Sequence, residues 1–219
     1  MRKEEFNAIG QELFAHLEGF AVADELVFQV PIKCALRGYC FERSSDKYSF
    51  YFWAFVFPLC APSNHLSLSL GDRLKIAGSM SADSRSPTMI EDIRRAMQNQ
   101  GRRYFLFPDD PQGIAEYILQ TMRGVPNPHA IEAAAYLFAR DGQLEHANRL
   151  LSSLERHIHA RVEWQRELGA RAQRIAQTLR DDPSAAIRQL DEWRMYTLKQ
   201  LKLEAFAASC ADLRMKNHS

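Results

Sequence analysis

The segment YSFYFWAFVF, residues 48–57, constrains the fold more than any other part of the chain, because seven of its ten residues are aromatic. Successive side chains of a β-strand point to opposite faces, so Phe50 and Phe52 would lie on one face and Tyr51, Trp53 and Phe55 on the other. Both faces are therefore apolar, which is typical of a central strand that is covered on both sides. We predict that Tyr51, Trp53 and Phe55 are buried beneath helices.

The segments around this strand predict an N-terminal helix packed on an antiparallel sheet of four to five strands. Residues 3–18 have apolar side chains at helical spacing, and Gly19 ends that pattern. Short runs rich in Val, Phe, Tyr and Leu, bounded by polar or proline-containing breaks, predict further strands. These runs are residues 26–32, 34–42, 65–71 and 102–108.

The second half of the chain predicts helices. Asp110, Asn127 and Asp182 each precede a proline, the pattern of an N-cap followed by proline at the first helical position. A capping box, Thr88 with Glu91, predicts an earlier helix that ends at Gly101. We further expect a long helix over 145–180, with a bend or break near 157–160, and a final helix over 183–213.

The apolar stripes of these last two helices are spaced to pack as an antiparallel hairpin. The first stripe comprises Trp164, Leu168, Ala172, Ile175 and Leu179, and the second comprises Ile187, Leu190, Trp193, Leu198 and Leu201. The chain is therefore expected to be α+β, with a sheet domain at 1–110 and an all-helical region at 111–219 packed against it. A rival interpretation has part of this seam meeting another chain, either as a homodimer through the C-terminal helices or as a heterocomplex.

Two stretches resemble known folds. Residues 130–156 resemble a single tetratricopeptide hairpin, without the second copy that an array would need about 34 residues away. The matching residues are Ala134, Ala135, Phe138, Gly142, Leu144, Ala147, Leu151 and Leu154. Residues 4–75 are similar to a bacterial family of helix-plus-antiparallel-sheet domains of unknown function. The matching residues there are Phe6, Leu13, Leu17, Gly19, Phe20, Phe28 and the strand at 48–57. That resemblance implies a fold but supplies no catalytic residues.

Charge and cysteine usage narrow the functional classes. The 28 basic and 27 acidic residues give a formal charge of +1, so no overall field attracts nucleic acid or anionic lipid. The longest apolar run, residues 50–62, is shorter than the roughly 20 residues of a spanning helix. The start of the chain lacks the pattern of a signal peptide. No pair of the four cysteines forms a C-x-x-C motif, and we expect Cys34, Cys40, Cys60 and Cys210 to be buried, reduced thiols of a cytoplasmic protein.

Candidates for catalysis and metal binding are few. Cys60 and His65, with Ser63 between them, follow the aromatic strand and would suit a nucleophile with a nearby base. Glu155, His159 and Glu163 recur every four residues and would share a helix face, but no Cys or His pattern elsewhere completes a zinc site. Phosphate-binding glycine motifs are absent from the sequence. We therefore expect no cofactor and no metal.

Arginines supply the candidate partner-binding residues: Arg102, Arg103, Arg161, Arg166, Arg171 and Arg174. A row of arginines suits an acidic partner or a phosphate backbone. Residues 37–44 also resemble the first ribonucleoprotein motif of RNA-recognition domains, but Glu42 and Ser44 depart from that pattern, and we favour a plain strand there.

The sequence favours a non-catalytic, cytoplasmic protein-interaction protein, of the kind represented by toxin-neutralising immunity proteins and secretion adaptors. The alternative is an enzyme whose active-site residues are dispersed along the chain. A second alternative is a nucleic-acid-binding protein that uses arginine-rich helices.

Overall fold

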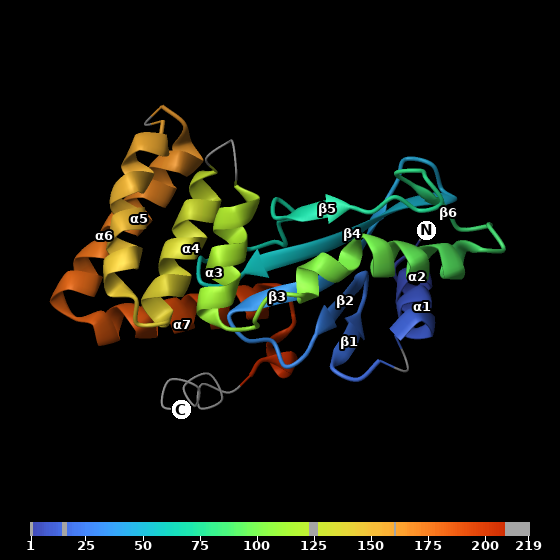
Figure 1. Cartoon of the computed structure of the whole chain (residues 1–219), viewed down its shortest axis with the longest axis horizontal. Helices are drawn as coiled ribbons and strands as arrows, with labels where there is room; N and C mark the ends of the chain where they lie inside the picture. Colours follow the sequence, from blue (N-terminus) through green and yellow to red (C-terminus); the bar gives the residue numbers. More distant parts are fainter. Residues whose placement is uncertain (1, 15–16, 123–126, 160, 209–219) are drawn as a thin grey trace. The chain divides into compact units, whose positions relative to one another are not determined.

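The computed structural model describes residues 2–14, 17–122, 127–159 and 161–208 (Figure 1). These residues form an α+β fold in which an N-terminal helix and an antiparallel sheet are followed by a series of helices. The chain divides into two compact units. The sheet unit comprises Met1–Ile32, Leu36–Phe57 and Ser67–Phe107. The helical unit comprises Lys33–Ala35, Pro58–Leu66 and the chain from Pro108 onward.

The sheet has six strands among the described residues, against the four to five expected. Its strands are β1 (Phe20–Ala23), β2 (Leu26–Gln29), β3 (Ala35–Arg43), β4 (Ser49–Pro58), β5 (Gly71–Arg73) and β6 (Ala82–Asp83). They follow the order β1-β2-β3-β4-β5, and β6 pairs with the start of β4. Three of these strands, the short β1, β5 and β6, are not among the expected ones, and β5 shares only Gly71 with the run expected at 65–71.

One face of the sheet is packed by aromatic rings. Helix α1 (Lys3–Phe14) places Phe6 with its ring centroid 5.4 Å from that of Phe41 and Phe14 with its centroid 5.6 Å from that of Tyr39. Phe50 and Phe52 of β4 are fully buried. This face holds the core of the sheet unit.

The opposite face of β4 is covered less completely than expected. Phe55 is fully buried, whereas Tyr51 and Trp53 are only half-buried. The register pairs Trp53 with Arg73 of β5, and the guanidinium of Arg73 lies 3.6 Å from the ring centroid of Tyr51 and 4.9 Å from that of Trp53. The prediction of burial is therefore confirmed for Phe55 and wrong for Tyr51 and Trp53, because an arginine of the neighbouring strand stacks on both rings.

Two predicted strands are wrong. Residues 65–70 form no strand, since the serine hydroxyls bond locally, with the Ser69 amide donating to Ser67 Oγ at 3.3 Å. The predicted strand at 102–108 is replaced by a 3₁₀ helix, η1 (Gly101–Phe105). It continues directly from α2 (Met89–Asn99), as 3₁₀ turns at helix ends often do.

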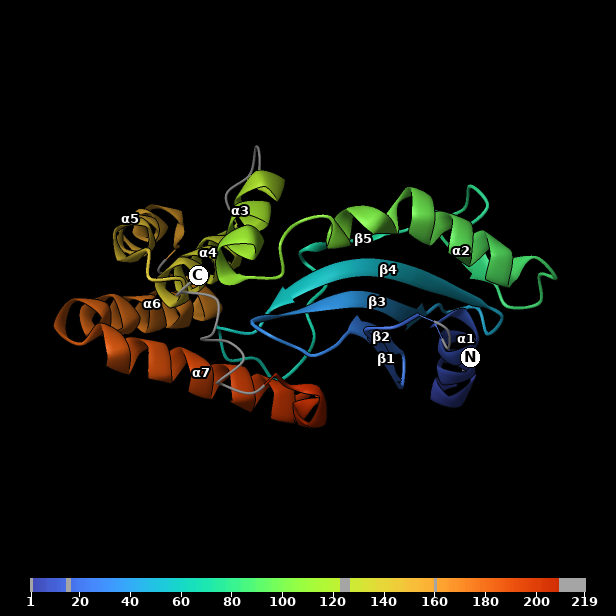
Figure 2. The same cartoon turned by 60° about the horizontal axis from the view of Figure 1, so that its bottom comes forward.

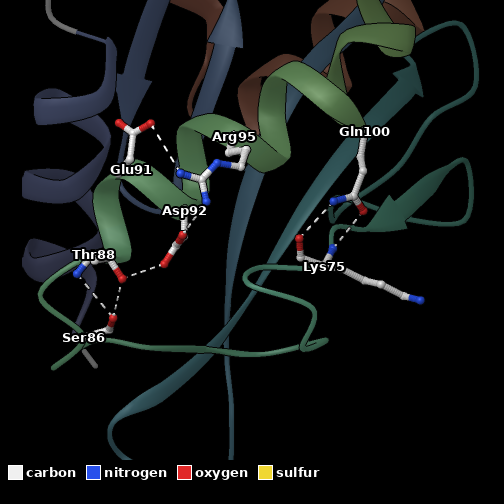
Figure 3. Close-up of polar contacts among 7 residues, drawn as sticks. All are labelled: Lys75, Ser86, Thr88, Glu91, Asp92, Arg95 and Gln100. Atoms are coloured by element: carbon white, nitrogen blue, oxygen red, sulfur yellow. Dashed lines mark hydrogen bonds and ion pairs between the residues drawn. The ribbon is translucent and has the colours of Figure 1, made fainter.

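Polar contacts at both ends of α2 tie it to the surrounding loops (Figure 3). At its start, Thr88 Oγ1 donates to Asp92 Oδ2 at 2.7 Å but accepts from no backbone amide of α2, so the expected capping box with Glu91 is wrong. At its end, the Gln100 side chain forms two hydrogen bonds with the backbone of Lys75. The amide of Lys75 donates to Gln100 Oε1 at 3.0 Å, and Gln100 Nε2 donates to the Lys75 carbonyl at 2.9 Å.

The helical unit contains α3 (Pro111–Thr121), α4 (Pro128–Arg140), α5 (Leu144–Leu154), α6 (Glu163–Asp181) and α7 (Pro183–Gln200). Short 3₁₀ segments, η2 (Glu155–His157) and η3 (Glu204–Phe206), follow α5 and α7. All three predicted Asx-Pro helix starts are confirmed, because the side chains of Asp110, Asn127 and Asp182 accept from backbone amides at 2.7, 3.0 and 3.0 Å. The final helix ends at Gln200, earlier than expected, and residues 209–213 of that prediction lie outside the described residues.

Helices α4 and α5 form the hairpin expected at 130–156. The turn between them contains Gly142 with a φ of +82°, a conformation that glycine adopts without strain. The small residues Ala134, Ala135 and Ala147 are fully buried.

Helices α6 and α7 form the expected antiparallel hairpin (Figure 2). Four of the five stripe residues of α6 are buried in the chain: Leu168, Ala172, Ile175 and Leu179. The fifth, Trp164, is 43 % exposed. In the second stripe Leu190 and Leu198 of α7 are buried, whereas Ile187, Trp193 and Leu201 are half-buried. Among the residues that the structure describes, no helix is both long and apolar enough to cross a membrane.

Candidate functional site

The candidate catalytic pair is divided between the interior and the surface of the helical unit. Cys60 is fully buried, and burial raises the pKa of its thiol, although the nearby Arg140 guanidinium acts in the opposite direction. His65 is exposed, and its backbone amide donates to Ser63 Oγ at 3.4 Å. In this arrangement the thiol is held neutral, which is the opposite of an activated nucleophile.

The other two described cysteines are in buried environments like that of Cys60. Cys34 and Cys40 are free and buried, and burial raises the pKa of both thiols, that of Cys40 to about 12. Cys210 lies outside the described residues. The described cysteines therefore have the environment of core residues.

Buried charges near Cys60 have structural roles. Arg140 and Asp191 form an ion pair at 2.7 Å with side chains 7 % and 16 % exposed. Arg194 is fully buried and donates to the carbonyl oxygens of Lys33 and, at 3.1 Å, of Ala208. These contacts join segments of the helical unit that are far apart in sequence.

The candidate metal ligands do not share a helix face. Glu155 lies in η2, His159 in the connection that follows, and Glu163 is the first residue of α6. Between η2 and α6 the helix is interrupted, and the His159 carbonyl accepts from the Val162 amide at 2.9 Å. Across the described ranges, no group of three or more His, Cys, Asp or Glu side chains is placed to hold a metal ion.

Two of the candidate arginines are occupied by acids of their own unit. Arg103 forms an ion pair with Asp72, which also accepts a hydrogen bond from the Tyr104 hydroxyl. Arg171 donates two hydrogen bonds, at 2.7 and 2.8 Å, to the fully buried carboxylate of Glu132. Arg171 is thereby a structural residue, because its partner is fully buried, whereas the Arg103–Asp72 pair lies at the surface.

The remaining candidates are exposed. The side chains of Arg102, Arg161, Arg166 and Arg174 form no hydrogen bond or ion pair with any other described residue. Their charges are therefore free to interact with a partner.

The aromatic residues that resemble a ribonucleoprotein motif are unavailable for stacking on bases. Tyr39 and Phe41 lie in β3 and are 4 % and 2 % exposed, because they pack beneath α1. On the other face, Trp53 Nε1 donates to Glu42 Oε2 at 2.7 Å, and Arg73 pairs with the same carboxylate at 3.3 Å. The polar groups of this half-buried patch are thus partnered within the sheet unit.

The arrangement best suited to binding is a groove of about 720 Å³ between α5 and α6, which lie side by side in Figure 1. The end of α5 and the connection after it contribute Leu151, Ser152, Leu154, Glu155 and Ile158. Helix α6 contributes Arg166, Gly169, Ala170, Ala172, Gln173, Ala176, Gln177 and Arg180. We call this site the α5–α6 groove.

The floor of the groove is apolar and its rim is polar. Small residues on α6 leave the space open, and Leu151 and Leu154 are buried beneath it. On the rim, Gln173 Nε2 donates to Glu155 Oε1 at 3.3 Å, and Arg180 donates to Gln177 Oε1 at 2.7 Å. An apolar floor with polar groups at its edge is typical of a binding site for a peptide or a small ligand.

Of the predicted site residues, Glu155 and Arg166 line this groove, and the sequence analysis did not identify the groove itself. The sequence pattern that could have indicated the groove is a second stripe on α6, beside the buried one. There small residues and glutamines recur at helical spacing between Arg166 and Arg180.

Comparison with known proteins gives no relative: no protein family, no curated protein and no solved structure matches the chain.

Proposed function

We propose that this chain is a non-catalytic protein-interaction protein that holds a segment of its partner in the α5–α6 groove. The observation that supports this function is the groove itself, with an apolar floor of small side chains and arginines at its rim. Immunity proteins and secretion adaptors are the classes of protein that act by such binding alone.

The chemistry of the other candidates supports the same choice. The thiol of Cys60 is buried with a raised pKa, and the half-buried patch around Trp53 is partnered internally. The groove combines open volume with exposed, unpaired charge at Arg166, which neither of those places does.

The test is affinity capture from native lysate with the wild-type chain and with an Ala170→Trp variant, followed by mass spectrometry. Ala170 is exposed and lines the groove, so an indole should fill the groove without disturbing the core. Glu167→Trp is the matched control, because Glu167 is exposed on the same helix outside the groove. We expect one protein to be retained by the wild type and the control and lost with Ala170→Trp. Equal capture by all three chains, or capture by none, would reject the proposed function.

A further inference from the structure

The row of α6 residues along the groove has the periodicity of a helix–helix interface. Gly169, Ala170, Gln173, Ala176 and Gln177 recur at spacings of three and four, which places them on one stripe of the helix. This stripe is distinct from the buried one that packs inside the unit. Helix α6 therefore offers a second face of the kind that packs against another helix.

Small residues on this stripe allow close approach. Ala170 and Ala176 project only a methyl group, and Gly169 projects none. A Cβ at Gly169 would lie 2.9 Å from Ile158 Cδ1, so the side chain of Ile158, in the connection after α5, already contacts the floor of the groove at Gly169. At Ala170 and Ala176, the backbone of an incoming helix can lie nearer to α6 than long side chains would permit.

An arginine lies at each end of the stripe. Arg166 and Arg180 are fourteen positions apart, which is close to four complete turns and roughly 21 Å along the helix axis. The side chain of Arg166 pairs with no described residue, and Arg180 is exposed and donates to the neutral amide of Gln177. The carboxylate of Glu155, on the opposite wall, accepts a hydrogen bond from Gln173 between the two ends.

We propose that the occupant of the α5–α6 groove is an amphipathic helix of a partner protein, with small or apolar side chains on the floor and acidic residues about four turns apart that pair with Arg166 and Arg180. This inference rests on the proposed function and specifies its partner. The charge pattern favours a helix of this kind, because an acidic residue at each end of an apolar stripe matches the cation at each end of the groove.

The experiment measures fluorescence anisotropy of three labelled, capped 18-residue peptides with the full chain at low salt. All share an Ala/Leu stripe on a helix-favouring background. The first has Glu at positions 2 and 16, the second has Gln at both, and the third keeps Glu but has proline in the centre. We expect saturable binding of the first peptide and at least tenfold weaker binding of the other two.

Charge-reversal variants of the chain test whether the peptide contacts the two arginines. Arg166→Glu and Arg180→Glu should each weaken binding of the acidic peptide by roughly three- to tenfold, since each replaces an attraction by a repulsion. Arg174→Glu is the matched control on the same helix, and it should leave binding unchanged, because Arg174 is exposed outside the groove. Ala170→Trp should abolish binding.

The outcomes separate the two proposals. Binding that Ala170→Trp abolishes but that is equal for all three peptides would overturn the acidic helix and preserve the groove as a binding site. Absence of binding of the acidic peptide up to about 1 mM would overturn the helical occupant, while the lysate capture tests the proposed function by itself. A concentration-dependent dimer of the chain that Ala170→Trp dissociates would identify a second copy as the occupant and overturn the inference.

Discussion

Glu132 and Arg171 show how the surroundings of a residue decide its role. Glu132 lies in the middle of α4 with no exposed surface, and its carboxylate accepts two hydrogen bonds from Arg171 and one from the Tyr136 hydroxyl at 3.0 Å. In the sequence Arg171 belongs to a row of arginines and is indistinguishable from Arg166 or Arg174. Of these three arginines, Arg171 has a structural role because it alone bonds Glu132 on the neighbouring helix α4.

Removing Arg171 should therefore destabilise the fold far more than removing its neighbour. Arg171→Met leaves a buried carboxylate without its counter-ion, and we expect the free energy of unfolding to fall by about 3 kcal/mol. Arg174→Met should change it by less than about 0.5 kcal/mol, as is usual for an exposed position. Urea denaturation of both variants measures the difference. A double variant, Glu132→Leu with Arg171→Met, should recover part of the loss, and equal stability of the two single variants would contradict this account.

At the scale of helices and strands, neighbouring residues in the sequence predicted the three Asx-Pro helix starts, but they did not predict the conformation of every segment. An Asx residue before proline satisfies an amide at the helix start through its own side chain, so that signal depends on neighbours in the sequence alone. The segments at 65–70 and 101–105 have apolar patterns that suit strands. Their conformations instead follow from serine hydroxyls that bond nearby amides and from the continuation of α2 into η1.

The contribution of the Gln100 side chain to the stability of the sheet unit can be measured. It bonds both the amide and the carbonyl of Lys75, so it takes the place that a neighbouring strand would have (Figure 3). Gln100→Ala should lower the free energy of unfolding by about 1–2 kcal/mol, because two backbone groups lose their partner. Gln98→Ala, at an exposed position of the same helix, is the control. Chemical denaturation that places both variants at the wild-type midpoint would show that water replaces Gln100 at no cost.

At the scale of the whole molecule, the chain enters the helical unit more than once. The segments 33–35 and 58–66 belong to that unit although they flank long strands of the sheet. Leu59 and Cys60 are fully buried in it, and Thr197 Oγ1 accepts from the Ser63 amide at 3.1 Å and donates to the Ala61 carbonyl at 3.3 Å. The helices after residue 108 are therefore an incomplete unit by themselves.

A fragment that starts at residue 108 should consequently fold poorly. It lacks the Lys33 carbonyl that accepts from the buried Arg194 and the side chains of Leu59 and Cys60. We expect a broad thermal transition by circular dichroism, with binding of a hydrophobic dye, where the full chain unfolds cooperatively. In the full chain, Thr197→Val should cost about 1 kcal/mol, since it removes both bonds to 58–66. A fragment that melts as sharply and at the same temperature as the full chain would refute this prediction.

The sequence by itself determined the fold class, the central aromatic strand, the three Asx-Pro helix starts and the α6–α7 hairpin, because these depend on periodicity and on neighbouring residues. Tertiary structure alone decided which arginines are free, how deeply Tyr51 and Trp53 are covered, and that α5 and α6 enclose a groove. Those properties depend on side chains brought together from distant parts of the chain, such as Glu132 with Arg171 and Arg73 with Trp53. The order of residues along the chain does not indicate which of these distant side chains meet.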